Sequence, residues 1–228
     1  MPCSSAASFS KATSAEGALV VIQVHPPTER GITLWGIGFA IVFLWSAIAP
    51  FDRFTWWLEI APALIAAGVL AFTRTRFPLT PLVYVLVLLH AWVLMIGGHY
   101  TYAKVPAFDW LRDALELWRN HYDRVGHFFQ GFVPAMVARE LLLRCTPLGR
   151  SGWLVTIVIS FCLAVSASYE LLEWGVAVAT GEAADAFLGT QGDPWDTQTD
   201  MFMCLIGAVT ALLTLSGVHD RALSDSRD

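Results

Sequence analysis

Acidic and histidine side chains stand at the ends of three strongly apolar segments, where a membrane protein would not ordinarily carry them. They form three pairs at helical spacing: Asp123 with His127, Glu170 with Glu173, and Asp196 with Asp200. Side chains three or four residues apart share one face of a helix. Ionisable groups in such positions are costly unless they pair, bind an ion or face water. We therefore expect the three faces to meet and to build one site.

These residue types support two kinds of chemistry. A carboxylate beside an imidazole either holds one histidine tautomer or joins it as a metal ligand. Further carboxylates would add oxygen ligands or act as a base, and their excess favours a divalent cation because uncompensated carboxylates repel one another. The candidate catalytic residues are Asp123, His127, Glu170, Asp196 and Asp200, and the candidate metal ligands are Asp123, His127, Glu170, Glu173 and Asp200.

Other polar residues are expected on the same side of the membrane as this site. They are His99, Tyr100, Asn120, His121, Arg124, Asp193 and Gln198. Two alternatives to a catalytic or metal site stay open. In one, Arg124, Arg53 and interfacial tyrosines neutralise the carboxylates in a purely structural network. In the other, the charged groups line a path for an ion or a proton.

Composition places the chain among polytopic membrane proteins. It has 228 residues, of which 56% are hydrophobic and 14% charged, against about 25% charged in a typical soluble domain. Mean hydropathy is +0.56 and there are ten tryptophans. No basic stripe suggests a nucleic acid partner, so that class is set aside.

Six segments are long and apolar enough to span a membrane, which takes about 17–25 residues. They are residues 32–49, 56–72, 81–97, 124–143, 152–177 and 199–217. His, Gln, Arg and Glu interrupt the fourth segment, so we expect the other helices to shield it. Within residues 98–123, Trp110, Leu111, Leu115 and Trp118 recur at helical spacing and predict an amphipathic helix on the outer surface. The expected fold is an all-α transmembrane bundle of about six spanning helices plus this interfacial helix.

The domain organisation follows from the same segments. We expect a disordered cytoplasmic tail at 1–31, a single transmembrane domain at 32–217 and a cytoplasmic tail at 218–228 that leaves His219 in solvent. Arg74, Arg76, Arg144 and Arg150 lie in two connections, whereas the connection between the fifth and sixth segments is acidic. The positive-inside rule then predicts cytoplasmic termini and a periplasmic polar site.

Several motifs make the chain resemble the YjdF-type family of bacterial inner-membrane proteins over residues 33–215. The motifs lie at residues 45–48, 52–56, 76–81, 97–102, 120–128, 169–174 and 192–198. This resemblance implies a multi-pass protein of the inner membrane and brings no established activity. A weaker likeness to VanZ-like membrane proteins rests on Asp123–Phe128, Glu170, and Asp196 or Asp200. Here Arg124 stands where that family has Lys, and the Asn that often follows the last Asp is missing.

Three functions are compatible with these observations. The first is an enzyme that acts on a lipid or a cell-envelope precursor at headgroup depth, with membrane lipids as its surroundings. The second is a small ion-coupled transporter, which would require polar residues across the whole membrane. The third is a non-catalytic scaffold, which would leave every carboxylate paired and no cavity between the helices.

Overall fold

The computed structural model describes residues 24, 27–180 and 190–224, and all regular secondary structure in these ranges is helical. The helices are α1 (Glu29–Ala47), α2 (Arg53–Thr73), α3 (Pro81–Tyr100), α4 (Pro106–Ala114), α5 (Tyr122–Cys145), α6 (Gly152–Thr180) and α8 (Asp196–Ser224). The prediction of an all-α bundle is confirmed.

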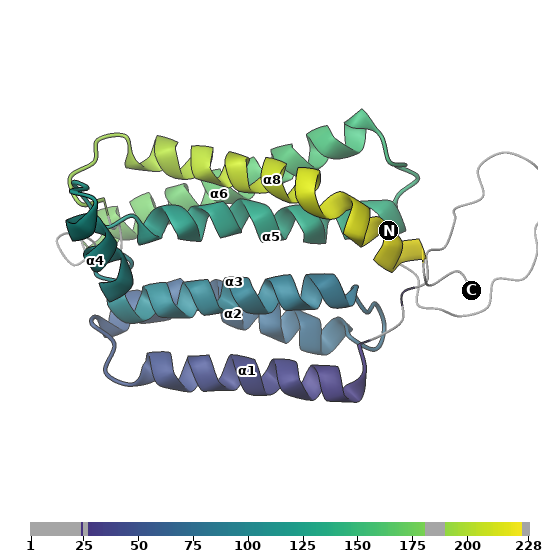
Figure 1. Ribbon diagram of the computed structural model, residues 1–228, viewed down its shortest axis with the longest axis horizontal. Coiled ribbons are helices and arrows are strands. Elements are labelled where there is room, and N and C mark those ends of the chain that lie inside the picture. The colour runs from purple at the N-terminus through teal and green to yellow at the C-terminus, as the bar shows by residue number, and fades with distance from the viewer. Residues whose placement is uncertain (1–23, 25–26, 181–189, 225–228) are drawn as a thin grey trace, which may run out of the picture.

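The long helices form two layers that run side by side (Figure 1). One layer contains α1, α2 and α3, the other contains α5, α6 and α8, and the contact between α3 and α5 joins them. The short helix α4 crosses one end of the bundle, which we call the α4 end. The ends of α3 and α6 and the beginnings of α2, α5 and α8 all lie there. The polar pairs of the sequence are therefore gathered at the α4 end.

Local sequence explains where several helices begin. The Thr28 hydroxyl accepts a hydrogen bond from the Gly31 amide at 3.1 Å, and Asp52 Oδ1 accepts one from the Thr55 amide at 2.7 Å. Both side chains satisfy amides that have no partner inside the first turn. Pro81 and Pro106 occupy the first helical position, where the missing N–H costs nothing.

Five helices, namely α1, α2, α3, α6 and α8, are long and apolar enough to cross a membrane. Helix α5, the expected fourth segment, falls outside that group because it carries buried charges such as Arg124, Arg139 and Glu140. It nevertheless lies between α3, α6 and α8 and runs alongside them (Figure 1). Shielding by these neighbours is what allows a helix of this composition inside the bundle.

The amphipathic helix is shorter than the prediction from residues 98–123. It ends at Ala114, and Glu116 has a φ of 52°, in the left-handed region. This turn breaks the helix before Trp118 and redirects the chain, so that Arg119 enters the bundle and is 1% exposed. Trp110 and Trp118 remain on the surface, 71% and 63% exposed, which suits tryptophan at a membrane interface.

Glycines bring α5 and α8 into backbone contact. A Cβ added at Gly131 would lie 1.8 Å from the Cys204 carbonyl oxygen, and one at Gly207 would lie 2.0 Å from the Phe128 carbonyl oxygen. Small residues of this kind let membrane helices approach closely. The close contact sets the distance between the polar residues that α5 and α8 carry at the α4 end.

A buried network holds the opposite end of the bundle together. Glu140 accepts hydrogen bonds from the Thr80 hydroxyl and from Arg144, both at 2.7 Å, and pairs with His219 at 3.0 Å. The prediction that His219 lies in solvent is wrong, because α8 continues to Ser224 and buries it completely. Arg139 reaches the other nitrogen of that imidazole at 2.8 Å. Most polar groups of this network therefore have partners inside the protein, and the exception among its described atoms is Arg144 Nε.

Candidate functional site

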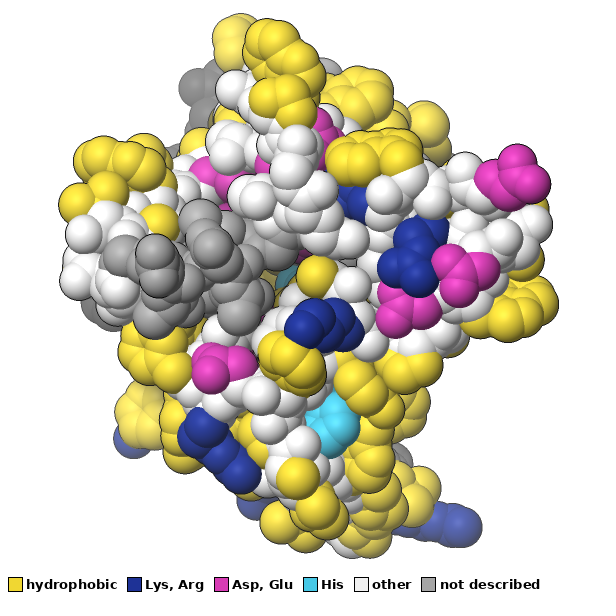
Figure 2. All heavy atoms as spheres, turned by 90° about the vertical axis from the view of Figure 1, so that its left-hand side faces the viewer, with side chains coloured by type: hydrophobic (Ala, Val, Ile, Leu, Met, Phe, Trp, Pro, Cys, Tyr) yellow, Lys and Arg dark blue, Asp and Glu magenta, His cyan; other side chains and the backbone are white. Residues whose placement is uncertain are grey.

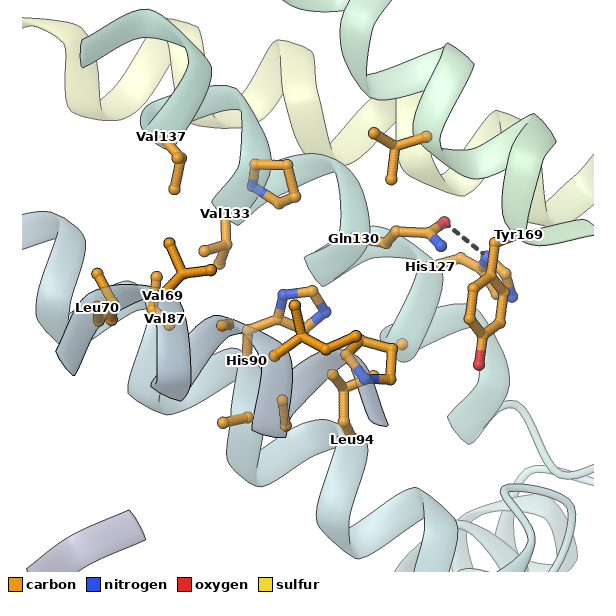
Figure 3. Close-up of a pocket in the computed structure, with 18 of the residues that line it drawn as sticks. Val69, Leu70, Val87, His90, Leu94, His127, Gln130, Val133, Val137 and Tyr169 are labelled. Atoms are coloured by element: carbon orange, nitrogen blue, oxygen red, sulfur yellow. Dashed lines mark hydrogen bonds between the residues drawn. The ribbon is translucent and has the colours of Figure 1, made fainter. Parts of the chain in front are cut away.

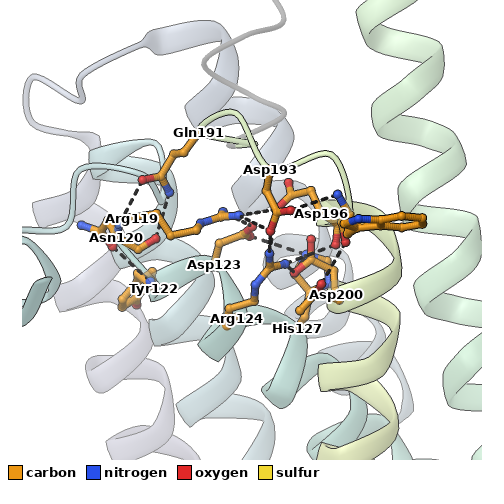
Figure 4. Close-up of polar contacts among 12 residues, drawn as sticks. Arg119, Asn120, Tyr122, Asp123, Arg124, His127, Gln191, Asp193, Asp196 and Asp200 are labelled. Carbon is orange, nitrogen blue, oxygen red and sulfur yellow. Dashed lines mark hydrogen bonds and ion pairs between the residues drawn. The ribbon is translucent and has the colours of Figure 1, made fainter. Parts of the chain in front are cut away.

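The predicted acidic and histidine residues converge at the α4 end (Figure 4). Asp123 and His127 lie one turn apart at the start of α5, and Asp196 and Asp200 lie one turn apart at the start of α8. Glu170 reaches the same place from α6. All five side chains are buried, with 2–8% of the residue exposed. Helical spacing aims each pair in one direction, and the contact between α5 and α8 brings the two pairs together.

Two arginines frame this group of carboxylates. Arg119 Nη1 lies 2.5 Å from Asp196 Oδ1, and Arg124 Nη2 lies 2.9 Å from the same oxygen. Arg124 also pairs with Asp193 at 2.8 Å and makes a short contact with Asp200. Hydrogen bonds to charged groups are the stronger kind, so these arginines fix the orientation of the carboxylates around them.

The imidazole of His127 lies at the centre of the group. Its Nε2 is 3.5 Å from Asp123 Oδ1 and 3.8 Å from Asp200 Oδ1. Its Nδ1 is 3.1 Å from Gln130 Oε1 and 3.8 Å from Glu170 Oε1. With Gln130 Oε1 as acceptor, Nδ1 carries a proton, and Nε2 faces the two aspartates.

One oxygen of Glu170 is unsatisfied. Within the described ranges, its buried Oε1 has no hydrogen-bond partner. A buried carboxylate oxygen without a partner is expensive, and such groups in folded proteins call for a functional explanation. Among the carboxylates that meet His127, Glu170 is therefore the one available for a further ligand or a proton.

An amide pair ties the segment before α8 to the segment before α5. The Asn120 amide donates to Gln191 Oε1 at 3.0 Å, and Gln191 Nε2 donates to the Asn120 carbonyl at 2.8 Å. The Asn120 side chain also donates to the Val105 carbonyl at 3.0 Å. These bonds hold Asp193 and Asp196 opposite Arg119 and Arg124 (Figure 4).

A cavity of about 630 Å³ opens beside His127, between the two layers of helices. Its polar end is lined by Glu59, Tyr102, Asp123, His127, Tyr169 and Glu173. Figure 3 shows the lining continuing from His127 and Gln130 past His90 to Val133, Val137 and Leu70, which are apolar. The cavity therefore joins a polar end to a long apolar wall.

Glu59 is the carboxylate at the far side of this polar end. It is 4% exposed, and its Oε2 accepts a hydrogen bond from the Tyr169 hydroxyl at 3.1 Å. The Tyr102 ring packs where a Cβ at Gly97 would lie 2.4 Å away. Burial and then the neighbouring Glu59 raise the pKa of Tyr102 well above its ordinary value, so its hydroxyl stays protonated.

Four of the other predicted residues lie outside the central group. His99 Nδ1 contacts the Ser46 carbonyl at 3.0 Å, and Tyr100 packs with His99 and Trp45 beside α1. Gln198 is exposed, and Glu173 lines the cavity without joining the aspartates around His127. His99 and Tyr100 are separated because they lie against α1, which contacts α3 in the layer away from α8.

His121 lies at the rim, just before α5. It is partly buried and packs edge-on to Trp118 with ring centroids 6.2 Å apart. Burial, together with the positive charges of Arg119 and Arg124, lowers the pKa of His121 from its ordinary value of 6.5. It is therefore a neutral group at the edge of the site.

Several residues of the site were missed by reasoning from the sequence. Glu59 and Arg119 lie in segments expected to form an outer turn and a surface helix. Tyr169 was expected on the side of the site and Gln130 as an interior polar group, but neither was predicted as a site residue, and Tyr102 carried no signal of its own. Glu59 offered the clearest clue, since it is a carboxyl group one turn inside an apolar segment.

The α4 end as a whole has mixed charge. Figure 2 shows basic and acidic side chains interspersed with large apolar ones on this face. Exposed tryptophans are among them, including Trp195 at 67%. A surface of this kind suits the membrane–water interface.

A metal ion would find one set of ligands in the described part of the chain. One ligand atom from each of Asp123, His127 and Asp200 lies within 4.8 Å of the others. The predicted ligand Glu170 is adjacent to this set, whereas Glu173 is in the cavity. Mixed nitrogen and oxygen donors of this type suit zinc, manganese or iron better than calcium.

Comparison with known proteins identifies relatives of the chain. A family described as predicted membrane protein (DUF2238) matches residues 32–221. The inner membrane protein YjdF of Escherichia coli (strain K12) is 49% identical over 183 residues, which cover 80% of this chain and 88% of that protein. No solved structure matches the chain.

These matches confirm the resemblance to the YjdF-type family, whose motifs include most of the residues around His127. They do not concern VanZ-like proteins, so that likeness stays a prediction. The family match covers every helix of the bundle except the first residues of α1 and the last of α8. The chain therefore belongs to the membrane protein family described as DUF2238.

Proposed function

We propose that this protein binds a membrane amphiphile, either a lipid or a lipid-linked cell-envelope precursor, and acts on its polar end. The observation that carries the proposal is the cavity of about 630 Å³, which joins His127 and Asp123 to an apolar wall. Its volume is within the range of about 300–1,000 Å³ that is usual for small-molecule sites. An amphiphile has the same division into a polar and an apolar part.

The length of the cavity supports this occupant. Its lining extends from Glu59 to Thr73 on α2 and from Asp123 to Leu141 on α5. At a rise of 1.5 Å per residue, these stretches measure about 21 Å and about 27 Å. The hydrocarbon core of a bilayer is about 30 Å thick. An acyl or isoprenoid chain therefore has room along the helices, with the head group at the α4 end.

The two alternatives fit the cavity less well. A scaffold would pair every carboxylate and leave no space, yet Glu170 keeps an unsatisfied oxygen and a cavity opens between the helices. A carrier for ions needs polar groups along the whole path. Toward the opposite end the lining includes Val69, Val137 and Leu141, which offer no ligand to an ion.

At the polar end, His127 and Asp123 are the groups that would contact the substrate. Asp123 holds the imidazole in place, and the pair serves either in proton transfer or in binding a metal that polarises the substrate. The lining is acidic, since none of the described residues around the cavity is Lys or Arg. An anionic head group would be repelled there unless it arrived with a cation.

We place the protein in the bacterial inner membrane as a multi-pass protein, in line with its Escherichia coli relative. The distribution of basic residues supports cytoplasmic termini and a periplasmic α4 end. Reporter fusions at the two termini and at the connection between α6 and α8 would test this orientation. Periplasmic reporter activity at either terminus would contradict it.

The proposed function is tested by the lipid that the protein retains. The full chain, purified in a mild detergent, would be analysed by native mass spectrometry as wild type, Val137→Trp and Val85→Trp. Val137 lines the cavity, whereas Val85 is 54% exposed on the outer face of α3. We expect the first variant to lose the bound amphiphile and the second to keep it. Equal retention in both variants would exclude the cavity as the binding site.

Catalysis is tested separately from binding. His127→Ala should keep the bound amphiphile and fail to complement any phenotype of a deletion strain, at unchanged abundance in the membrane. Full complementation by His127→Ala would show that the imidazole takes no part in the activity.

A further inference from the structure

We propose that Asp123, His127 and Asp200 bind one divalent transition-metal cation, of the zinc or manganese type, with Glu170 beside it. The inference goes beyond the proposed function, because it concerns a site that would exist with or without an amphiphile in the cavity. It rests on four observations around one imidazole.

The first observation is the spacing of the donor atoms. His127 Nε2 lies 3.5 Å from Asp123 Oδ1 and 3.8 Å from Asp200 Oδ1. Both separations are long for a hydrogen bond. A tetrahedral site with bonds of about 2.1 Å has its ligand atoms about 3.4 Å apart. The two separations from Nε2 are therefore within a few tenths of an ångström of what such a cation requires, and all three ligand atoms lie within 4.8 Å of one another.

The second observation is the direction of the imidazole. In the neutral tautomer that donates its Nδ1 proton to Gln130 Oε1, 3.1 Å away, Nε2 carries the lone pair. Nε2 faces Oδ1 of Asp123 and of Asp200, so a cation that replaces the proton of this nitrogen would be shared by three donor atoms. Histidine ligands of metals commonly donate their other N–H in this way.

The third observation is charge. The described residues of the group carry five carboxylates and two guanidinium groups, so negative charges exceed positive charges by three. The carboxylates belong to Asp123, Glu170, Asp193, Asp196 and Asp200. The guanidinium groups belong to Arg119 and Arg124. Asp193 and Asp196 are each paired with an arginine at 2.9 Å or less. A divalent cation at His127 would offset most of the remainder, which would otherwise be costly to bury.

The fourth observation is the unsatisfied oxygen of Glu170. This residue is 8% exposed, and its Oε1 lies 3.8 Å from the His127 imidazole without a hydrogen-bond partner among the described residues. It comes from α6, so it is independent of the spacing of the α5 and α8 residues. A cation, or a water molecule bound to one, would satisfy it.

The nature of the ligands limits the metal. One imidazole and two or three carboxylates suit zinc and manganese. Calcium takes six to eight oxygen ligands at about 2.3–2.6 Å, which this small group does not provide. Arg124 contacts Asp200 as well, and it orients that carboxylate as residues around metal ligands usually do.

The experiment uses the full chain with a purification tag that contains no histidine. Samples stripped with a chelator would be titrated with Zn²⁺ or Mn²⁺, and bound metal would be counted by elemental mass spectrometry. We expect about one cation per chain in the wild type and in the control Asp113→Asn, whose side chain is 71% exposed on α4. Asp200→Asn and His127→Gln should bind at least about tenfold more weakly.

A spectroscopic measurement needs no variant and so does not depend on folding of the mutants. In the Mn²⁺ form of the wild type, pulsed electron paramagnetic resonance should detect one imidazole nitrogen bound to the ion. Absence of that coupling, or equal metal content in the wild type and Asp200→Asn, would overturn the proposal. Lipid retention, measured on the same samples, reports on the proposed function independently.

Discussion

The close contact between α5 and α8 makes a quantitative prediction for Gly131→Ala. The added Cβ would lie 1.8 Å from the Cys204 carbonyl oxygen and 2.9 Å from the Ala208 amide nitrogen. An ordinary contact between a carbon and a carbonyl oxygen is about 3.3 Å or longer, so the two helices must separate by about 1.5 Å. Both obstacles are backbone atoms, which cannot rotate away as a side chain would.

The expected cost is a loss of about 2–4 kcal/mol in the free energy of unfolding, at the upper end of the range for overpacked cores. The separation would also reach the polar site. His127 belongs to α5 and Asp200 to α8, and they are 3.8 Å apart at the closest nitrogen and oxygen. If the helices separate, the distance between these two atoms would increase to about 5 Å. One cation with bonds of about 2.1 Å to each atom cannot bridge that distance. We therefore expect the variant to lose bound metal as well as stability.

Unfolding of the purified protein in mixed micelles, followed by tryptophan fluorescence, measures the change. Gly68→Ala is the matched control, because Gly68 is exposed inside α2 and a Cβ there meets nothing within 4 Å. It should be neutral or stabilising by up to about 1 kcal/mol. Gly207→Ala should behave like Gly131→Ala, since its Cβ would lie 2.0 Å from a carbonyl oxygen of α5. If Gly131→Ala unfolds with the same free energy as Gly68→Ala, the reasoning about this contact is refuted.

Two further predictions concern the ends of the bundle. Glu140→Ala would remove the carboxylate that pairs with the buried Arg144 at 2.7 Å. The uncompensated charge of Arg144 should lower the free energy of unfolding by about 3–5 kcal/mol in the same assay. A decrease of less than about 1 kcal/mol would show that the network contributes little to stability. His121 has a lowered pKa, through burial and the charge of Arg119, so the folded state favours its neutral form. Its contribution to stability is complete above its ordinary pKa of 6.5 and is lost as pH falls below that value. The wild type should therefore lose more stability than His121→Gln between about pH 7 and about pH 5, and parallel pH profiles would contradict the assignment.

Apolar windows and helical spacing were sufficient to predict most of the fold. Each of the six predicted segments corresponds to a helix, and for the five apolar ones the reason is that an apolar stretch must satisfy its backbone internally in a membrane. The spacing of Asp123 with His127, and of Asp196 with Asp200, also predicted correctly that each pair shares one helix face. Where a local turn decided the outcome, prediction failed: the left-handed residue Glu116 ended α4 early.

The partners of each pair could not be read from the sequence. Periodicity determines the direction of a side chain around its own helix, whereas the rotation and offset of one helix against another depend on packing. Gly131 and Gly207 set that offset for α5 and α8, and they bring Asp200, not Glu173, to His127. The cavity is likewise a property of the arrangement, since its walls come from both layers of helices. The sequence by itself determined where the helices run and which helix face each charged pair occupies. Only the tertiary structure decided which groups are buried and which of them meet, because that depends on contacts between segments far apart in the chain.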